Sequence, residues 1–93
     1  MDTTQPAPPE REQRLNAILA AYLEAALEES DPALFMAALG DIARAKGMTE
    51  IARKTGLGRE SLYKALSPDG NPEFATVLKV VRSLGLNLHA TAG

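Results

Sequence analysis

The sequence predicts an all-α fold, a compact bundle of about five helices. Apolar residues recur at steps of three and four along several segments, which is the spacing of one face of an α-helix. The chain is 45% hydrophobic but only 4% aromatic, so its core must consist mainly of Leu, Ile, Val and Ala, which suits closely packed helices. Its 93 residues suit a single domain, and no repeat suggests a solenoid.

The composition also narrows the setting of the protein. The chain has no cysteine, which excludes disulfides, thiolate zinc sites and cysteine nucleophiles and favours a reducing, cytoplasmic environment. No segment approaches the roughly 20 apolar residues of a membrane span. The first ten residues, MDTTQPAPPE, lack the basic-then-apolar order of a signal peptide.

The first third of the chain is expected to contain a tail and one helix. Residues 1–10 are polar and rich in proline and indicate a disordered tail, which leaves residues 11–93 as the domain. Residues 11–29 form an amphipathic pattern, and the acidic residues near its end oppose the helix macrodipole, so we expect that end to fray or to be solvated. The apolar positions of this helix are Leu15, Ile18, Leu19, Tyr22, Ala26 and Leu27.

A second helix is predicted to begin at Pro32, with Asp31 as its N-cap, and to end at a left-handed Gly47. Gly40 in its interior costs about 1 kcal/mol relative to alanine, and we interpret it as the mark of a close helix crossing. The buried positions of this helix are expected to be Leu34, Phe35, Ala38, Leu39 and Ile42.

Two short helices and a longer one are expected to follow. The first runs from Glu50 to Thr55 with Thr49 as its cap, and the second covers residues 59–66. After the turn SPDGNP, Asn71 and Pro72 are expected to cap a last helix. Its core positions are Phe74, Val77, Leu78, Val81 and Leu84, and Gly85 ends it; the alternating LNLHA at residues 86–90 indicates a possible short strand.

Charge is distributed unevenly along the chain. The net charge is −2, yet residues 1–31 carry seven acidic and two basic residues, whereas residues 32–66 carry six basic and three acidic ones. Attraction to phosphates depends on a local basic patch and not on the total charge. The basic part coincides with the two short helices, so nucleic acid is a reasonable partner.

The spacing of these short helices fits a helix-turn-helix at about residues 49–66, in which two helices cross at a tight turn. Ala52 would lie where the helices touch, and Gly56 would take the turn position with positive φ. Ile51, Leu57 and Leu62 would point into the core and fix the angle of the second helix. The same spacing also occurs by chance in many helical hairpins, and the basic patch favours the DNA-binding interpretation.

From about Tyr22 to Leu88 the chain resembles the HigA-like branch of the addiction-module antidote family, which has a lambda-repressor-like helix-turn-helix fold. The segments that carry the resemblance are AYLEAALEESDPALFMAALGDIARAKGMT and IARKTGLGRESLYKALSPDGNPEFATVLKVVRSLGL. The resemblance implies an antitoxin that neutralises a RelE-like toxin by direct binding and represses its own operon, usually as a homodimer. Members often carry a polar residue, commonly Gln, where Met48 stands here, and a serine cap where Gly58 stands.

Candidate DNA contacts lie mainly on the second short helix. Arg59 opens it and can pair with guanine, Lys64 can reach a base or a phosphate, and Glu60 can accept from cytosine or repel phosphates. Ser61 and Tyr63 are candidate phosphate donors. The alternative for Arg59 and Lys64 is a solvated face, and the alternative for Tyr63 is that its ring packs on the domain. Sequence-independent attraction is expected from Arg44, Lys46, Arg53 and Lys54.

Alternatives remain at this point. One is a solitary phage-type repressor without a toxin, and another is a protein-interaction module that has lost DNA binding. The acidic first helix could cover a basic toxin or complete the core, and a C-terminal strand could pair with its copy across a two-fold axis. An enzyme is not expected, and neither is a cofactor or a metal: His89, the sole histidine, has no ligand or catalytic partner in sequence.

Overall fold

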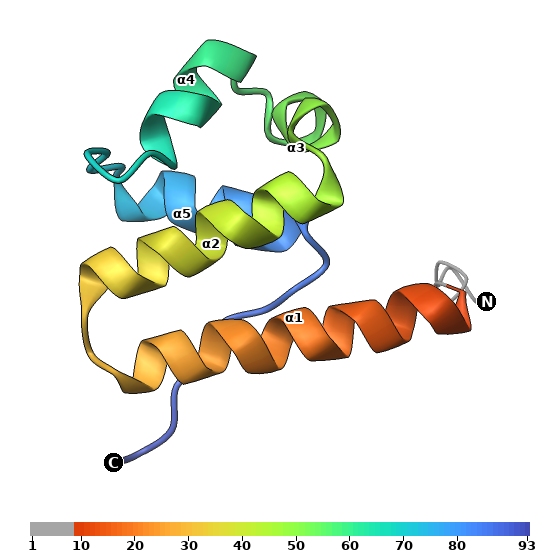
Figure 1. Ribbon diagram of the computed structural model, residues 1–93, viewed down its shortest axis with the longest axis vertical. Coiled ribbons are helices and arrows are strands. Elements are labelled where there is room, and N and C mark those ends of the chain that lie inside the picture. Colours follow the sequence, from red (N-terminus) through yellow and green to blue (C-terminus); the bar gives the residue numbers. More distant parts are fainter. Residues whose placement is uncertain (1–8) are drawn as a thin grey trace, which may run out of the picture.

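Figure 1 shows the computed structural model, which describes residues 9–93. Within that range the chain forms five helices and no strand. The all-α prediction is therefore confirmed. The tail expected over residues 1–10 falls largely outside the described residues, and Glu10 already belongs to the first helix. The helices are α1 (Glu10–Glu28), α2 (Pro32–Lys46), α3 (Met48–Thr55), α4 (Arg59–Ala65) and α5 (Phe74–Ser83).

Helix α2 lies in the middle of the molecule. It packs along α1 as an antiparallel hairpin, and it also contacts α3, which in turn packs against α4 and α5 (Figure 1). As a result α1 lies at one end of the molecule, while α3 and α4 lie at the other. The two ends are therefore separate surfaces joined through α2.

The turn between α1 and α2 follows the predicted capping chemistry. The side chain of Asp31 accepts a hydrogen bond from the backbone N–H of Ala33 at 3.0 Å, and Pro32 occupies the first turn, as expected. Ser30, which precedes the cap, has φ of 56°. A residue with a Cβ is strained in this left-handed region, so the turn is closed at some cost.

Two predicted N-caps are wrong. Helix α3 begins at Met48, with Gly47 as its N-cap in place of Thr49. Met48 is only 6% exposed, and its burial places it and Thr49 within the first turn of the helix. Helix α5 begins at Phe74 with Glu73 as the N-cap residue, and neither Asn71 nor Pro72 caps it. No side chain forms a capping hydrogen bond at either helix start.

The core is aliphatic, as the composition predicts. Its fully enclosed side chains come from α2, α3, α4, α5 and the segment after α5, and α1 contributes two buried residues, Leu23 and Ala26. The largest fully buried side chains are Leu39, Ile42, Ile51, Leu62, Val80, Val81 and Leu84.

Several predicted core positions are exposed. In α1 the contact with α2 is made by the stripe that contains Leu19, Leu23 and Ala26, so the other apolar residues of that helix remain outside. Phe74, expected at the start of the last helical stripe, is 66% exposed because the core side of α5 is formed by Val77, Val80 and Val81. Also exposed, against expectation, are Leu15, Ile18, Tyr22, Leu27 and Leu34.

The possible strand at residues 86–90 is absent from the described chain. A strand needs a neighbouring strand to satisfy its backbone groups, and this single chain offers none. Instead Leu86 is buried and Leu88 packs partly against the core, while residues 86–89 lie beside Ala20, Leu23 and Leu27 of α1. The segment thus holds the C-terminal part of the chain against the core and α1 through its leucine side chains.

Candidate nucleic-acid interface

The turn between α3 and α4 is fixed by backbone conformation and by one hydroxyl group. Gly56 has φ of 78° and donates its N–H to the carbonyl of Ala52 at 3.0 Å, which closes α3. The hydroxyl of Thr55 donates to the carbonyl of Ile51 at 2.8 Å and accepts from the N–H of Leu57 at 3.3 Å. The Thr55 hydroxyl therefore links the end of α3 to the turn by two hydrogen bonds, a role that the sequence pattern did not indicate.

Both helices are anchored to the core by the side chains expected to do so. Ile51 and Ala52 of α3 are buried, and Leu62 of α4 is completely enclosed. Leu57 in the turn is half-buried and packs against the same core. Because α4 has one fully buried side chain in its middle, its opposite side is held outward.

The outward side of α4 is polar. Arg59, Glu60, Ser61 and Lys64 are exposed, and the ring of Tyr63 is 43% exposed. The guanidinium of Arg59 lies 5.7 Å from the centroid of the Tyr63 ring, a cation–π contact between neighbouring turns. Neither Arg59 nor Lys64 forms an ion pair within residues 9–93. This face therefore offers two unpaired cations and two hydroxyl groups to a partner.

The basic residues of α3 are already engaged. Arg53 and Lys54 both pair with the carboxylate of Glu50, which lies one turn earlier on the same helix. The hydrogen bond from Arg53 holds the pKa of Glu50 below its ordinary value, and the positive charges of Arg53 and Lys54 act in the same direction. Glu50 thus neutralises part of the local positive charge.

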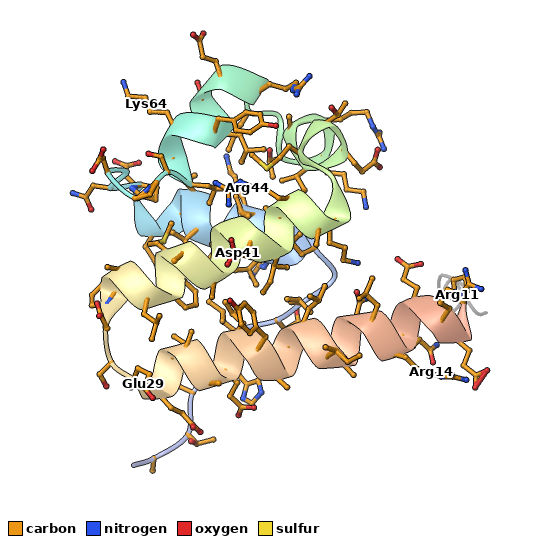
Figure 2. The ribbon with its side chains drawn as sticks, viewed as in Figure 1. Arg11, Arg14, Glu29, Asp41, Arg44 and Lys64 are labelled. Atoms are coloured by element: carbon orange, nitrogen blue, oxygen red, sulfur yellow. The ribbon has the colours of Figure 1, made fainter. Side chains whose placement is uncertain are left out.

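The two cations expected at the end of α2 point to different places. The guanidinium of Arg44 lies 3.5 Å from Asp41 and approaches Gly40, on the part of α2 that meets α4 (Figure 2). Lys46 instead donates to the side chain of Asn16 at 2.6 Å and ties α2 to α1. The structure therefore brings Arg44 towards the α3–α4 end and places Lys46 away from it.

Two glycines permit close backbone contacts at the end of α4. A Cβ on Gly40 would lie 3.1 Å from the carbonyl oxygen of Leu66, so the close approach at Gly40 is to the residue that follows α4. A Cβ on Gly70 would lie 2.5 Å from the carbonyl oxygen of Ala65 and 2.6 Å from that of Lys64. The SPDGNP segment signals a turn in sequence, but only the folded chain reveals that Gly70 folds back onto α4.

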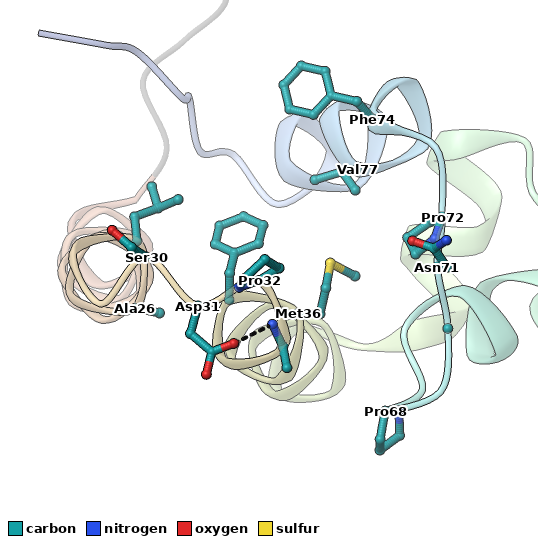
Figure 3. A pocket seen from close by; sticks show the side chains of 14 residues that line it. Ala26, Ser30, Asp31, Pro32, Met36, Pro68, Asn71, Pro72, Phe74 and Val77 are labelled. Carbon is teal, nitrogen blue, oxygen red and sulfur yellow. Dashed lines mark hydrogen bonds between the residues drawn. The ribbon is translucent and has the colours of Figure 1, made fainter.

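Other features of the described chain are not part of this face. A pocket of about 630 Å³ opens between the junction of α1 and α2, the loop before α5 and α5 itself, and it is lined mainly by apolar side chains such as Phe35, Met36 and Phe74 (Figure 3). Within residues 9–93 no cluster of three or more His, Cys, Asp or Glu side chains is arranged to hold a metal ion. None of the described helices has the length and apolar character needed to cross a membrane.

Comparison with known proteins adds two likenesses. Residues 11–92 match the family model described as "Probable addiction module antidote protein". An uncharacterized protein of Haemophilus influenzae is 57% identical over 65 residues, which represent 70% of this chain and 67% of that protein. No solved structure matches this chain.

Proposed function

The chain belongs to the family of probable addiction module antidote proteins, the antitoxins of toxin–antitoxin modules, and from this premise we propose that it is a DNA-binding antitoxin. It neutralises a RelE-like toxin by direct binding in the cytoplasm and, as a homodimer, represses its own operon. Its action is stoichiometric, without catalytic turnover or a cofactor. The proposal assigns DNA recognition to one end of the molecule and leaves the remaining surface for protein partners.

The observation that carries the proposal is the two-sided character of α4. Leu62 is fully enclosed, whereas Arg59 and Lys64, on the opposite side, are exposed and pair with no acid within residues 9–93. A short helix presented in this way after a tight turn fits the recognition helix of a helix-turn-helix, whose first residues meet base edges in the major groove.

Each polar residue then receives a role. Arg59 pairs with a guanine, and its contact with Tyr63 restricts the guanidinium before binding. Lys64, Ser61 and Tyr63 contact a base or phosphates, and Glu60 accepts from cytosine or disfavours wrong sequences.

Phosphate attraction without sequence preference comes from Arg53, Lys54 and Arg44. Lys46 contributes to it only at longer range, because its ammonium group is bound to Asn16.

The test is fluorescence anisotropy with the DNA immediately upstream of the gene and with a scrambled duplex, each at two salt concentrations. We expect tighter, salt-sensitive binding to the upstream DNA, and a loss of about tenfold or more in preference after Arg59→Ala with Lys64→Ala. The matched control removes two exposed cations from α5, Lys79→Ala with Arg82→Ala. If both double variants lose the same amount of DNA binding, the binding depends only on overall positive charge and the proposal is contradicted.

A protein-interaction module without DNA binding is the second candidate. It is favoured by the apolar side chains exposed along α1, of which Ile18 is 65% exposed. Such a module would bind the toxin equally well with and without Arg59 and Lys64, and it would show no preference for the upstream DNA.

A further inference from the structure

The exposed side of α1 carries an ordered set of side chains. Three large apolar residues, Leu15, Ile18 and Tyr22, are 42%, 65% and 49% exposed, although they follow helical spacing. They continue in both directions to a charged residue at each end of the helix. We call the whole set the α1 stripe: Arg11, Leu15, Ile18, Tyr22, Ala25 and Glu29.

The α1 stripe lies beside the contact with α2 but is not part of it. The contact uses Leu19, Leu23 and Ala26, each one residue after a member of the stripe and so rotated by about 100° around the helix. Only Tyr22 touches α2 by a polar bond, since its hydroxyl donates to Asp41 at 3.3 Å. The stripe is therefore an open apolar surface on a helix that is already packed on its neighbouring face.

Charge differs between the two ends of α1. Arg11 and Arg14 lie in the first turns together with Glu10 and Glu12, whereas Glu24, Glu28 and Glu29 lie at the other end without a basic neighbour on the helix, where the helix macrodipole disfavours them (Figure 2). These three acids form no ion pair within residues 9–93, and neither does Arg11. The first turns of α1 are balanced in charge, because Glu10 and Glu12 offset Arg11 and Arg14, and Arg14 pairs with Glu10. The last turn is acidic. Of the α1 stripe itself, Arg11 and Glu29 are the charged residues, and both are without an ion pair within residues 9–93.

We propose that the α1 stripe is the surface on which two copies of this chain pair, with their α1 helices antiparallel. The steps between stripe residues are four, three, four, three and four, so the pattern reads the same from either end. An antiparallel copy therefore places Arg11 opposite Glu29, Leu15 opposite Ala25 and Ile18 opposite Tyr22, and each pair occurs twice. The apolar residues are buried between the helices, as in a coiled-coil seam.

A second copy fits this surface better than another partner does. A basic toxin would complement the acidic end of α1 but would leave Arg11 without an acidic partner, whereas an antiparallel copy pairs Arg11 with Glu29 at each end of the contact. This inference rests on the proposed function only for the statement that the protein is a homodimer, and it moves the contact from the C-terminal segment to α1.

The test measures the mass of the full chain without DNA or toxin by sedimentation equilibrium. We expect a dimer at micromolar concentration, and Ile18→Glu should weaken dimerisation by about a hundredfold or more, because each dimer buries this side chain twice. Phe74→Glu is the matched control, since Phe74 is a large apolar residue of equal exposure at 66% and lies outside the stripe. Circular dichroism verifies that both variants are folded.

Orientation is tested by charge and by cross-linking. Arg11→Glu and Glu29→Arg should each weaken the dimer, and the double variant should restore it. Because the natural chain has no cysteine, a mixture of Leu15→Cys and Ala25→Cys chains should form a disulfide-linked heterodimer in preference to either homodimer.

Several outcomes would overturn the proposal. These are a monomeric natural chain, a dimer that Ile18→Glu leaves intact, or preferential homodimer cross-links, which indicate parallel helices. A chain that remains monomeric but loses toxin binding with Ile18→Glu would assign the stripe to the toxin. Failure of DNA binding with a dimer of the expected behaviour would reject the proposed function alone.

Discussion

The two ends of the molecule use their apolar residues in opposite ways. At the α3–α4 end, Leu62 and Leu66 are 0% and 4% exposed, and what α4 presents to solvent is mostly polar. In α1, by contrast, Leu23 and Ala26 are the buried residues, and the large side chains of the α1 stripe remain outside. A finished polar surface suits a charged partner, whereas an apolar stripe suits another apolar surface. Substitutions at the two ends should therefore differ in their cost to stability.

The largest effect is expected from Leu62→Ala. The substitution leaves a cavity beneath α4 and should lower the free energy of unfolding by about 2–5 kcal/mol, as measured by urea denaturation. Ile18→Ala in α1 removes a similar volume from an exposed position and should cost less than about 1 kcal/mol in dilute protein. The cost of Ile18→Ala should grow with protein concentration, because the dimer is then lost as well. Equal costs at every concentration would contradict the contrast between the two ends.

A smaller loss is expected from Gly70→Ala. The new Cβ would lie 2.5 Å from the carbonyl oxygen of Ala65, so the loop or the end of α4 must move, at a cost of about 1–3 kcal/mol in the free energy of unfolding. Gly58→Ala is the control, since a Cβ there meets nothing within 4 Å and its φ of −68° is ordinary. If the two variants unfold at the same urea concentration, the close approach does not limit α4.

Ser30→Gly should stabilise the α1–α2 hairpin. Ser30 adopts φ of 56°, and glycine removes that strain but gains entropy in the unfolded chain, so the net gain is about 0.5–1 kcal/mol. Thermal unfolding of the variant beside Ser67→Gly, a serine outside the left-handed region, supplies the comparison. A loss of stability in Ser30→Gly would show that the hydroxyl group matters more than the backbone conformation.

The smallest effect concerns Glu50 and pH. Because Arg53 lowers the pKa of Glu50 in the folded chain, its ion pairs stabilise the fold above the pKa of the unfolded state. This contribution is lost as pH falls through the lowered pKa, so Glu50→Gln should flatten the acid side of the stability curve slightly. The variant should also bind DNA up to about tenfold more tightly at low salt, since Arg53 and Lys54 are released. Weaker binding would mean that Glu50 itself orders the interface.

The helices and most of the core positions of α2 to α5 were predictable from the sequence, but the buried face of α1 was not. Both Leu15–Ile18–Tyr22 and Leu19–Leu23–Ala26 follow helical spacing, and a periodic pattern cannot say which of two adjacent apolar stripes meets α2. The same ambiguity explains Phe74, which precedes the core face of α5. A periodic apolar pattern therefore cannot distinguish the apolar residues that are buried in the chain from those that remain exposed.

The local features of the candidate site were more predictable from the sequence than its contacts with distant segments of the chain. The positive φ of Gly56 and the burial of Leu62 follow from the turn and from spacing. The contact of Gly70 with α4, the hydroxyl brace of Thr55 and the tie between Lys46 and Asn16 each depend on where other segments lie in space. Met48 belongs to the same group, since only its burial reveals that α3 starts earlier than its polar residues indicate.

The modest share of α1 in the core has a consequence for dynamics. Helix α1 contributes two buried side chains and the half-buried Leu19, and it is also held by the segment after α5 and by the bonds from Tyr22 to Asp41 and from Lys46 to Asn16. Helices α2 to α5, by contrast, share the fully enclosed core. Helix α1 can therefore open as a separate cooperative unit, and its amide hydrogens should exchange with solvent before those of α2 and α5. Pairing of two α1 helices would slow that exchange, so the exchange rate of one helix reports how much of the protein is assembled.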